Sequence, residues 1–465
     1  MNYTILISVL VVYFAAMIGI GLKGKKNYGQ TFDSKISANK TVGVWLFMGG
    51  AVGAHIGNGF VVGGAGDAAS LGLTGACYGL ACALSYVVVA ATVNKKVYET
   101  GYVTLPSYLK QRYNDKTIVV VVSVVHVIKY IANIGVQLMA GKALFVALGL
   151  NGTVGVFVMM GVVLVYSALS GLWGTLATSV VQTVVIVLGL VGAAIYIIAT
   201  GGITSITSAV TAGTLPADYL KLFPTTSSFT GLLISGITMG MGMMADQCMI
   251  QRVCSCKSSS TAMKGWIFSI CVLVGAAFLP VLCGMYGRTM FGVTGNPAFF
   301  SVVINVFPAF LGAIMIAAVL AAIMSSCDGF LVGISSIVGN DLYRGMIKPN
   351  ASEKELNRLD LICSAVAAIV AVVIALYVNS IIGMLFTICS FSAATCFAPF
   401  IGGLFWKRGT AKAAWISTIV GAIFVVLYIT GVTVTPLKEM LAAIVAIITY
   451  VIVSFATKEQ PKAEA

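Results

Sequence analysis

Two adjacent serines and an aspartate lie inside an apolar run of the sequence. Residues 321–330 read AAIMSSCDGF, and the apolar run around them begins near Phe307. Serine hydroxyls and backbone carbonyls can together bind a hard, partly dehydrated cation such as sodium, because hard cations prefer oxygen ligands. The alternative is that Ser325 and Ser326 hydrogen-bond only to carbonyls one turn earlier in their own helix. Asp328 lies about 200–300° around such a helix from the serines, so we expect a structural carboxylate there.

A second unusual segment is rich in glycine. Residues 49–66 read GGAVGAHIGNGFVVGGAG, and each glycine inside a helix costs roughly 1 kcal/mol relative to alanine. Clustered glycines permit close helix packing, or an unwound turn whose carbonyls face a cavity. A weaker glycine pattern, GLLISGITMGMGMM, follows five apolar stretches later at 231–244. Paired interruptions five stretches apart are typical of inverted-repeat transporters, which bind the solute and the ion beside the broken helices.

Few other polar residues interrupt the apolar stretches. His55 falls inside the glycine-rich break, where it either bonds a neighbouring helix or lines a cavity. His126 and Lys129 are three residues apart on one helical face, which Asn133 and Gln137 continue. A buried lysine must snorkel or form an ion pair, although a gating or solute-binding role stays open.

One acidic residue closes an apolar stretch near its inner end. Asp246 and Gln247 follow the stretch at 229–250, in MADQCMIQR. We expect them to cap a helix or to bond at an inner gate rather than to contact a solute.

The composition predicts an all-α polytopic membrane protein. Of the 465 residues, 59% are hydrophobic and 9% charged, against about 25% charged in soluble domains. About thirteen apolar stretches are long enough to span a bilayer; they lie near 3–22, 43–65, 72–93, 117–147, 152–170, 173–199, 229–250, 264–286, 307–338, 356–379, 381–405, 411–430 and 436–457.

The charge of the connecting loops predicts the orientation. Most of the 27 basic residues fall in alternate connections, which the positive-inside rule places in the cytoplasm. The N-terminus is then outside and the C-terminus inside (N-out/C-in), with an odd number of spans. The net charge of +13 follows from this topology and requires no nucleic-acid partner.

Several blocks of the sequence carry a resemblance to a known family. They are QLMAGKALFVALGL (137–150), SGLWGTLATSVVQ (170–182), DQCMIQRVCSCKSSSTAMKG (246–265), AAIMSSCDGFLVGISSIVGNDLY (321–343) and APFIGGLFWKRGTAKAA (398–414). In this order and spacing, the chain resembles the sodium:solute symporter family along nearly its whole length. The resemblance implies a LeuT-like core of five-plus-five inverted-repeat helices and alternating-access transport driven by a sodium gradient.

The resemblance also implies particular site residues. Its sodium site would fall on backbone oxygens and serine hydroxyls, at Gly53, Ile56, Ala322, Ser325 and Ser326. Its solute cavity would be lined by residues of several stretches: His55, Asn58, Gly59, Phe60, Tyr78, Gln137 and Gly242. Two positions depart from the family. Ser179 replaces an aspartate found in relatives that use a second sodium, which favours one sodium per solute; Gly242 replaces the tyrosine gate of sugar-transporting relatives, which argues against a hexose carrier of that type.

This resemblance predicts a division of the chain into five parts. Residues 1–42 would form a peripheral first helix and a cytoplasmic loop, and 43–199 the first repeat. An extracellular loop would occupy 200–228 and the second repeat 229–405. Residues 406–465 would add two peripheral helices and a short cytoplasmic tail.

The expected function is sodium-coupled import of a small organic solute across the cell membrane. Such a protein breaks no bond in its solute and is not an enzyme. Alternatives are a proton-coupled or uncoupled carrier on the same scaffold, with His55 or Asp328 titrating, a channel, or a ligand sensor that does not transport. No central arginine is available to bind a carboxylate, so a neutral, zwitterionic or cationic solute is favoured. We expect a functional monomer in the lipid bilayer.

Overall fold

The computed structural model describes residues 2–28, 31–167, 171–377, 380–430 and 439–457. Regular structure within these ranges is helical, with a single isolated backbone bridge between Val42 and Cys256. The helices of the first half are α1 (Tyr3–Tyr28), α2 (Phe32–Ser37), α3 (Val44–His55), α4 (Gly64–Leu71), α5 (Cys77–Thr92), α6 (Asn94–Thr100), α7 (Leu105–Tyr113), α8 (Lys116–Ala147), α9 (Gly152–Ser167), α10 (Leu172–Ala199) and α11 (Gly202–Thr211).

The second half contributes eleven further helices. They are α12 (Thr226–Met244), α13 (Gln247–Cys254), α14 (Ser259–Ala276), α15 (Leu279–Phe291), α16 (Pro297–Asn305), α17 (Ala309–Ser335), α18 (Glu353–Tyr377), α19 (Ile381–Ser392), α20 (Ala398–Phe405), α21 (Ala411–Ile429) and α22 (Glu439–Ala456). Short 3-10 turns form η1 (Ala38–Lys40) and η3 (Gly72–Ala76); π-helical turns form η2 (Gly59–Gly63), η4 (Ser336–Ile347) and η5 (Ala393–Phe397).

The helices are those of a multi-pass integral membrane protein. Among the described residues, ten helical segments are long and apolar enough to cross a membrane. Three shorter apolar helices accompany them: Val44–His55, Gly152–Leu164 and Met440–Ala456. The prediction of an all-helical membrane protein is therefore confirmed.

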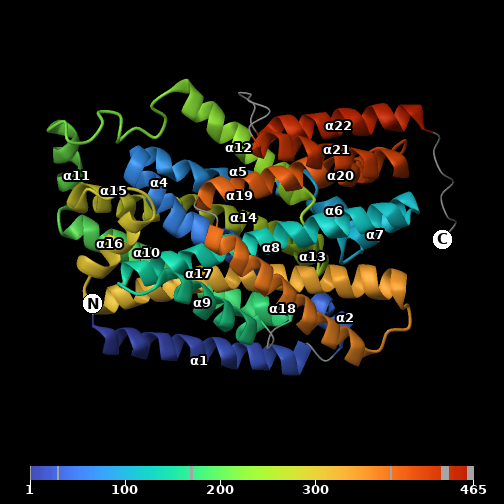
Figure 1. Cartoon of the computed structure of the whole chain (residues 1–465), viewed down its shortest axis with the longest axis horizontal. Helices are drawn as coiled ribbons and strands as arrows, with labels where there is room; N and C mark the ends of the chain where they lie inside the picture. Colours follow the sequence, from blue (N-terminus) through green and yellow to red (C-terminus); the bar gives the residue numbers. More distant parts are fainter. Residues whose placement is uncertain (1, 29–30, 168–170, 378–379, 431–438, 458–465) are drawn as a thin grey trace.

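Burial separates central from peripheral helices, whose arrangement Figure 1 shows. Of the apolar stretch of α17, 83% is buried, and of α8 67%, whereas α1 is only 22% buried. Helix α17 packs against α10, α8 and α3, while α1 covers one edge of the bundle and α21 and α22 pair along the opposite edge. The low burial of the apolar helix α1 is consistent with a position facing lipid. The serines of α17, in contrast, lie in the most buried of the ten helices.

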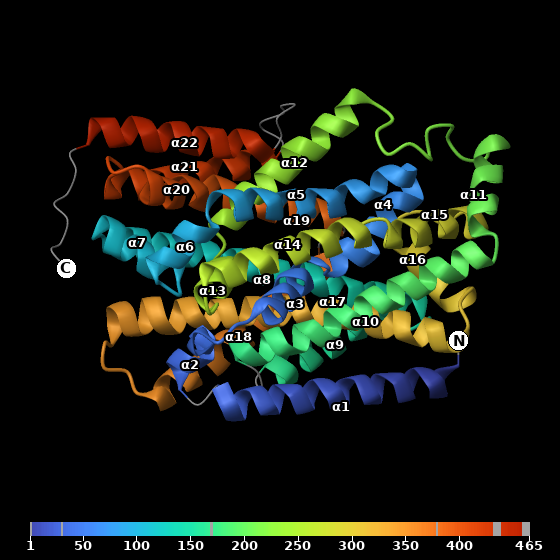
Figure 2. The ribbon, with the colours of Figure 1, turned by 180° about the vertical axis from the view of Figure 1, so that it is seen from behind.

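The predicted break in the second apolar stretch is present. Helix α3 ends at His55, and Ile56 leaves the helical region with ψ at 55°. The chain resumes as the π-helical turn η2 and continues as α4, so residues 56–58 interrupt the stretch. Helix α3 packs against α10, α14 and α17, which brings the break beside the centre of α17 (Figure 2).

The glycines at 231–244 have a different role from the one predicted. Helix α12 runs unbroken to Met244, and the interruption comes after it, at Ala245 and Asp246. A Cβ at Gly236 would lie 2.6 Å from the Leu84 side chain, so this glycine permits close packing against α5. The interpretation of this pattern as a second glycine-driven break is therefore wrong, because packing explains it.

Candidate functional site

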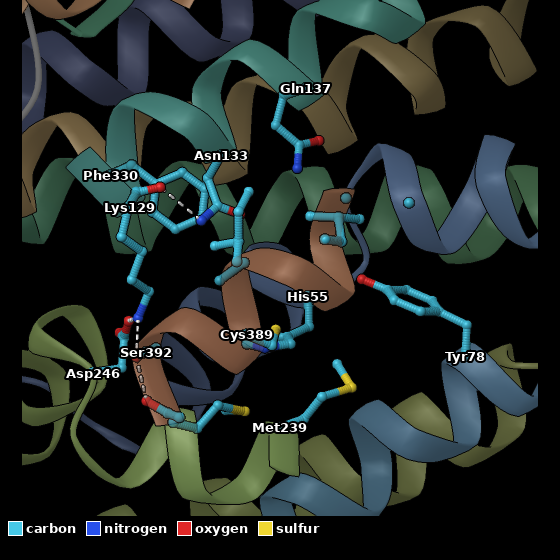
Figure 3. Close-up of a pocket in the computed structure, with 17 residues that line it drawn as sticks. His55, Tyr78, Lys129, Asn133, Gln137, Met239, Asp246, Phe330, Cys389 and Ser392 are labelled. Atoms are coloured by element: carbon cyan, nitrogen blue, oxygen red, sulfur yellow. Dashed lines mark hydrogen bonds and ion pairs between the residues drawn. The ribbon is translucent and has the colours of Figure 1, made fainter. Parts of the chain in front are cut away.

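A cavity of about 70 Å³ lies where the break after α3 meets α5, α8, α12 and α19 (Figure 3). One cation, one anion and several amide, hydroxyl and aromatic groups share this cavity with apolar side chains. Its lining residues are Ala54, His55, Gly57, Gly59, Tyr78, Lys129, Asn133, Gln137, Met239, Gly242, Met243, Asp246, Phe330, Leu385, Ile388, Cys389 and Ser392.

A buried ion pair closes one side of the cavity. The Lys129 ammonium of α8 contacts the carboxylate of Asp246 and lies 2.9 Å from the Ser392 hydroxyl of α19. Asp246 also accepts hydrogen bonds from the Tyr130 hydroxyl (3.2 Å) and from the backbone N–H of Met249 (3.1 Å). Asp246 is thus the N-cap of α13. It is also the counterion of Lys129, and Figure 3 shows this ion pair. The two charges offset one another within the cavity wall.

The break itself is fixed to α8 by two amide side chains. Gln137 accepts a hydrogen bond from the backbone N–H of Asn58 (2.9 Å), and the Asn58 side-chain amide donates to Val136 O (3.0 Å). The first bond satisfies a backbone N–H that the interrupted helix leaves unpaired, and the second ties the Asn58 side chain to the backbone of α8. The Gln137 Nε2 group remains as a donor beside the cavity.

A cluster of buried oxygen atoms lies where α17 meets the end of α3. The Ser325 hydroxyl oxygen is 2.7 Å from Gly53 O and 3.1 Å from Ala322 O. The Ser326 hydroxyl oxygen is 3.3 Å from Gly53 O, 3.4 Å from Ala54 O and 3.1 Å from Ala322 O. Both serines are 1% exposed. Two hydroxyls and three carbonyls of two helices therefore converge on one buried point.

This donor set fits sodium and disfavours softer or divalent metals. All five groups are neutral oxygens, and in the part of the chain that the structure describes no group of three or more histidine, cysteine or acidic residues could hold a metal. Ser179 of α10 also approaches, since a Cβ at Gly53 would lie 3.2 Å from its Cβ and 3.3 Å from that of Ser325. Ser179 therefore borders the cluster with a hydroxyl in place of a carboxylate.

Gly57 connects the oxygen cluster with the cavity. A Cβ at this position would lie 2.7 Å from the Ser326 hydroxyl oxygen and 3.1 Å from the Gln137 amide oxygen. Gly57 also lines the cavity. One backbone turn thus separates the two sites, and a movement of this turn affects both.

Replacing Gly57 with alanine should therefore weaken binding at both sites. A methyl group forced into this space destabilises the protein by about 1–3 kcal/mol, and the turn must move to relieve the steric overlap. We expect the purified variant to bind a cation at the oxygen cluster and a small molecule in the cavity less tightly than the wild type, as measured by titration of its thermal stability. Gly161→Ala is the matched control, because a Cβ there meets nothing within 4 Å. Weaker binding at only one of the two sites would contradict the idea that Gly57 connects them.

Most of the expected site residues converge in space. His55, Gly59, Tyr78, Gln137 and Gly242 line the cavity. Four residues of the expected oxygen set, Gly53, Ala322, Ser325 and Ser326, form the cluster described above.

Three of the expected residues lie elsewhere. Asn58 is fully buried and bonded to α8, and Phe60 is 2% exposed and packs towards Gly79 of α5. Neither lines the cavity. Ile56 is buried at the end of α3, and the oxygen contacts of the serines are made by Gly53, Ala54 and Ala322 instead.

Several residues of the cavity lie outside the set expected to line it. Lys129 and Asn133 share a helical face with Gln137, and for Lys129 a gating or solute-binding role was left open. Asp246 was expected to cap a helix or bond at a gate; it does cap α13, and it also lines the cavity. Apolar residues such as Phe330 and Leu385 carried no signal, because they differ in no way from other core residues.

Comparison with known proteins shows the family to which this chain belongs. The family model described as "Sodium:solute symporter family" matches residues 36–421. The chain belongs to the sodium:solute symporter family. Sodium/myo-inositol cotransporter 2 of Bos taurus is 27% identical, over 89% of this chain and 68% of the relative. Sodium/glucose cotransporter 1 of Ovis aries is 26% identical, over 89% of this chain and 70% of the relative.

A solved structure shares the fold of this symporter-family member. The substrate-bound outward-open state of a Na+-coupled sialic acid symporter aligns with a TM-score of 0.83 and 18% identity, over 99% of both chains. This likeness establishes a LeuT-like fold. Membership of the family makes the protein a transporter rather than an enzyme, with sodium as the coupling ion.

Proposed function

We propose that this symporter-family member imports a small organic solute together with sodium across the cell membrane by alternating access. The observation that carries the proposal is the oxygen cluster of Ser325, Ser326 and Gly53, separated from the cavity only by Gly57. In this proposal sodium binds among these oxygens and the solute binds in the cavity. One sodium accompanies each solute, because Ser179 supplies no charge for a second.

Linkage then explains the coupling. Sodium bridging α3 and α17 stabilises the break at residues 56–58, which forms one wall of the cavity. Sodium therefore raises the affinity for the solute, and the solute raises the affinity for sodium by the same factor. The membrane potential adds about 2.3 kcal/mol per charge per 100 mV to inward movement of the ion. Low cytosolic sodium then releases both.

We further propose the thirteen-span, N-out/C-in topology for this chain. The ten long and three short apolar helices are consistent with an odd number of spans. Helices α2, α6 and α7, which carry Lys35, Lys95 and Arg112, lie at one end of the bundle, and α11, α15 and α16 at the other (Figure 1). The basic end is the cytoplasmic end in this proposal. Residues 43–199 and 229–405 are the two inverted repeats of a functional monomer.

The charge of the cavity favours a neutral or zwitterionic solute. Lys129 and Asp246 are paired, so a solute with net charge would bring an uncompensated charge into a buried site. The small volume of the cavity favours a small molecule. The named solutes of the two curated relatives, myo-inositol and glucose, are neutral molecules with several hydroxyl groups, and myo-inositol is the first to test.

Thermal stabilisation of the purified protein tests this function. The panel comprises myo-inositol, D-glucose, sialic acid, L-proline, choline and glycine betaine, each in sodium and in potassium buffer. We expect one of them to stabilise the protein, and the shift to require sodium. Equal stabilisation in both buffers would contradict sodium coupling, and uptake into sodium-free proteoliposomes driven by a proton gradient would favour the proton-coupled alternative.

A further inference from the structure

The imidazole of His55 is held by a tyrosine on the neighbouring helix. His55 ends α3 and is half-buried in the cavity wall. Its Nδ1 atom lies 2.7 Å from the hydroxyl oxygen of Tyr86 of α5. The same hydroxyl hydrogen-bonds to the carbonyl oxygen of Ala51, one turn before His55.

Counting protons determines the tautomer of His55. The Tyr86 hydroxyl has one proton, and a carbonyl oxygen can only accept. The proton of Tyr86 must therefore point at Ala51 O, since two bare oxygen atoms would repel each other at hydrogen-bond distance. The contact between Tyr86 and His55 then requires the proton on Nδ1, which donates to the tyrosine oxygen. In the neutral imidazole this leaves Nε2 without a proton, as a hydrogen-bond acceptor.

Tyr86 cannot easily turn away from this arrangement. Its ring meets that of Trp266 edge to face, with centroids 4.7 Å apart, and Trp266 meets Phe47 in the same way at 4.9 Å. All three side chains are fully buried. The Trp266 indole N–H donates to the Asn94 side chain (3.2 Å), which fixes the tryptophan as well. The packing of Phe47, Trp266 and Tyr86 therefore fixes the position of the tyrosine hydroxyl. Its contact with Nδ1 in turn fixes the His55 ring.

We propose that Tyr86 fixes His55 as a hydrogen-bond acceptor of the cavity, so that the solute must present an O–H or N–H donor to Nε2. The proposal rests on the proposed transport function and names the class of solute. Hydroxyl, ammonium and amide N–H groups fit this position. A carboxylate does not, because its lone pairs would face the lone pair of Nε2. His55 is the specificity-determining residue and Tyr86 its positioning residue.

The other side of the cavity carries hydrogen-bond donors. Lys129 uses two of its three N–H donors on Asp246 and Ser392, and Gln137 Nε2 is an amide donor. Figure 3 shows Lys129 and Gln137 on the α8 side of the cavity and His55 between them and Met239. The cavity therefore offers a bound solute a hydrogen-bond acceptor at His55 and hydrogen-bond donors on α8. A molecule with a donor at one edge and an acceptor at the other matches this pattern.

Nitrogen NMR tests the tautomer without any solute. The chain has two histidines, so ¹⁵N-histidine labelling gives two sets of ring signals, which His126→Gln and His55→Asn assign independently. We expect a protonated Nδ1 and an unprotonated Nε2 on His55. Tyr86→Phe should leave a mixture of tautomers, whereas Tyr13→Phe, at a tyrosine bonded to Gln182 and away from the cavity lining, should change nothing. A protonated Nε2 with a bare Nδ1 in the wild type would overturn the proposal.

Binding of the six panel solutes tests the specificity. The solute that binds best in sodium should lose affinity by about tenfold in His55→Leu, and much less in His55→Gln, which keeps an acceptor oxygen. Glycine betaine carries neither O–H nor N–H, so we expect no binding of it. Sodium-dependent binding of glycine betaine, or full affinity in His55→Leu, would refute the acceptor role while leaving symport intact. Sodium-independent binding of every solute would instead contradict the proposed function, whatever the tautomer.

Discussion

Replacing Ser326 with alanine should raise the sodium concentration needed for half-maximal transport by about ten- to a hundredfold. The Ser326 hydroxyl lies within 3.4 Å of three carbonyl oxygens at the junction of α3 and α17. An oxygen contact to a charged group is worth about 1.5–3 kcal/mol, which corresponds to this loss of affinity. Ser325→Ala should act similarly, because its hydroxyl contacts Gly53 O and Ala322 O. Sodium titration of uptake into proteoliposomes measures the effect.

The matched control for this experiment lies in the same helix. Ser335 is also buried in α17, but its hydroxyl has no hydrogen-bond partner among the described residues. Ser335→Ala should keep the wild-type sodium dependence. An unchanged sodium dependence in Ser326→Ala would mean that the cation binds elsewhere.

Breaking the ion pair between Lys129 and Asp246 should strongly destabilise the protein. Removing one partner of a buried pair leaves an uncompensated charge and costs about 3–5 kcal/mol. Among the described residues, Lys129→Met leaves the Asp246 carboxylate with two hydrogen bonds, from the Tyr130 hydroxyl and the Met249 N–H. We expect a strongly lowered melting temperature in detergent and loss of solute binding.

A double variant separates the charge effect from the loss of the side chains. Lys129→Met with Asp246→Asn removes both charges, so it should be more stable than Lys129→Met alone. Asp360→Asn breaks a comparable pair with Lys35 outside the cavity, and it should leave solute affinity unchanged. If the double variant were as unstable as the sum of the two single variants, the paired charge would not be the cause.

Local sequence signals predicted much of this site. The adjacent serines in an apolar stretch and the glycine-rich interruption before Asn58 both mark places where a membrane helix is unfavourable. Because such interruptions are rare and costly in a bilayer, they identify functional positions without knowledge of the fold. The pairing of the two segments came from resemblance to the family, and the structure brings Ser325 within 2.7 Å of Gly53 O.

Contacts between distant segments could not be predicted in the same way. Lys129 and Asp246 are 117 residues apart, so the need for a counterion was predictable but its identity was not. The sequence does not distinguish Tyr86 from other tyrosines of apolar helices. Its role depends on the contact of its hydroxyl with His55, which ends α3. The glycines of α12 were misinterpreted because glycine favours both close packing and helix breaks, and only the neighbouring side chains distinguish the two.

Equilibrium binding of radioactive sodium to the purified protein tests whether the oxygen cluster is the sodium site. We expect saturable binding to the wild type and to Ser335→Ala, with higher affinity in the presence of the best-binding panel solute. We expect this binding to be lost when Ser325 and Ser326 are both replaced by alanine. Saturable, solute-enhanced sodium binding that survives the double replacement would show that sodium binds elsewhere.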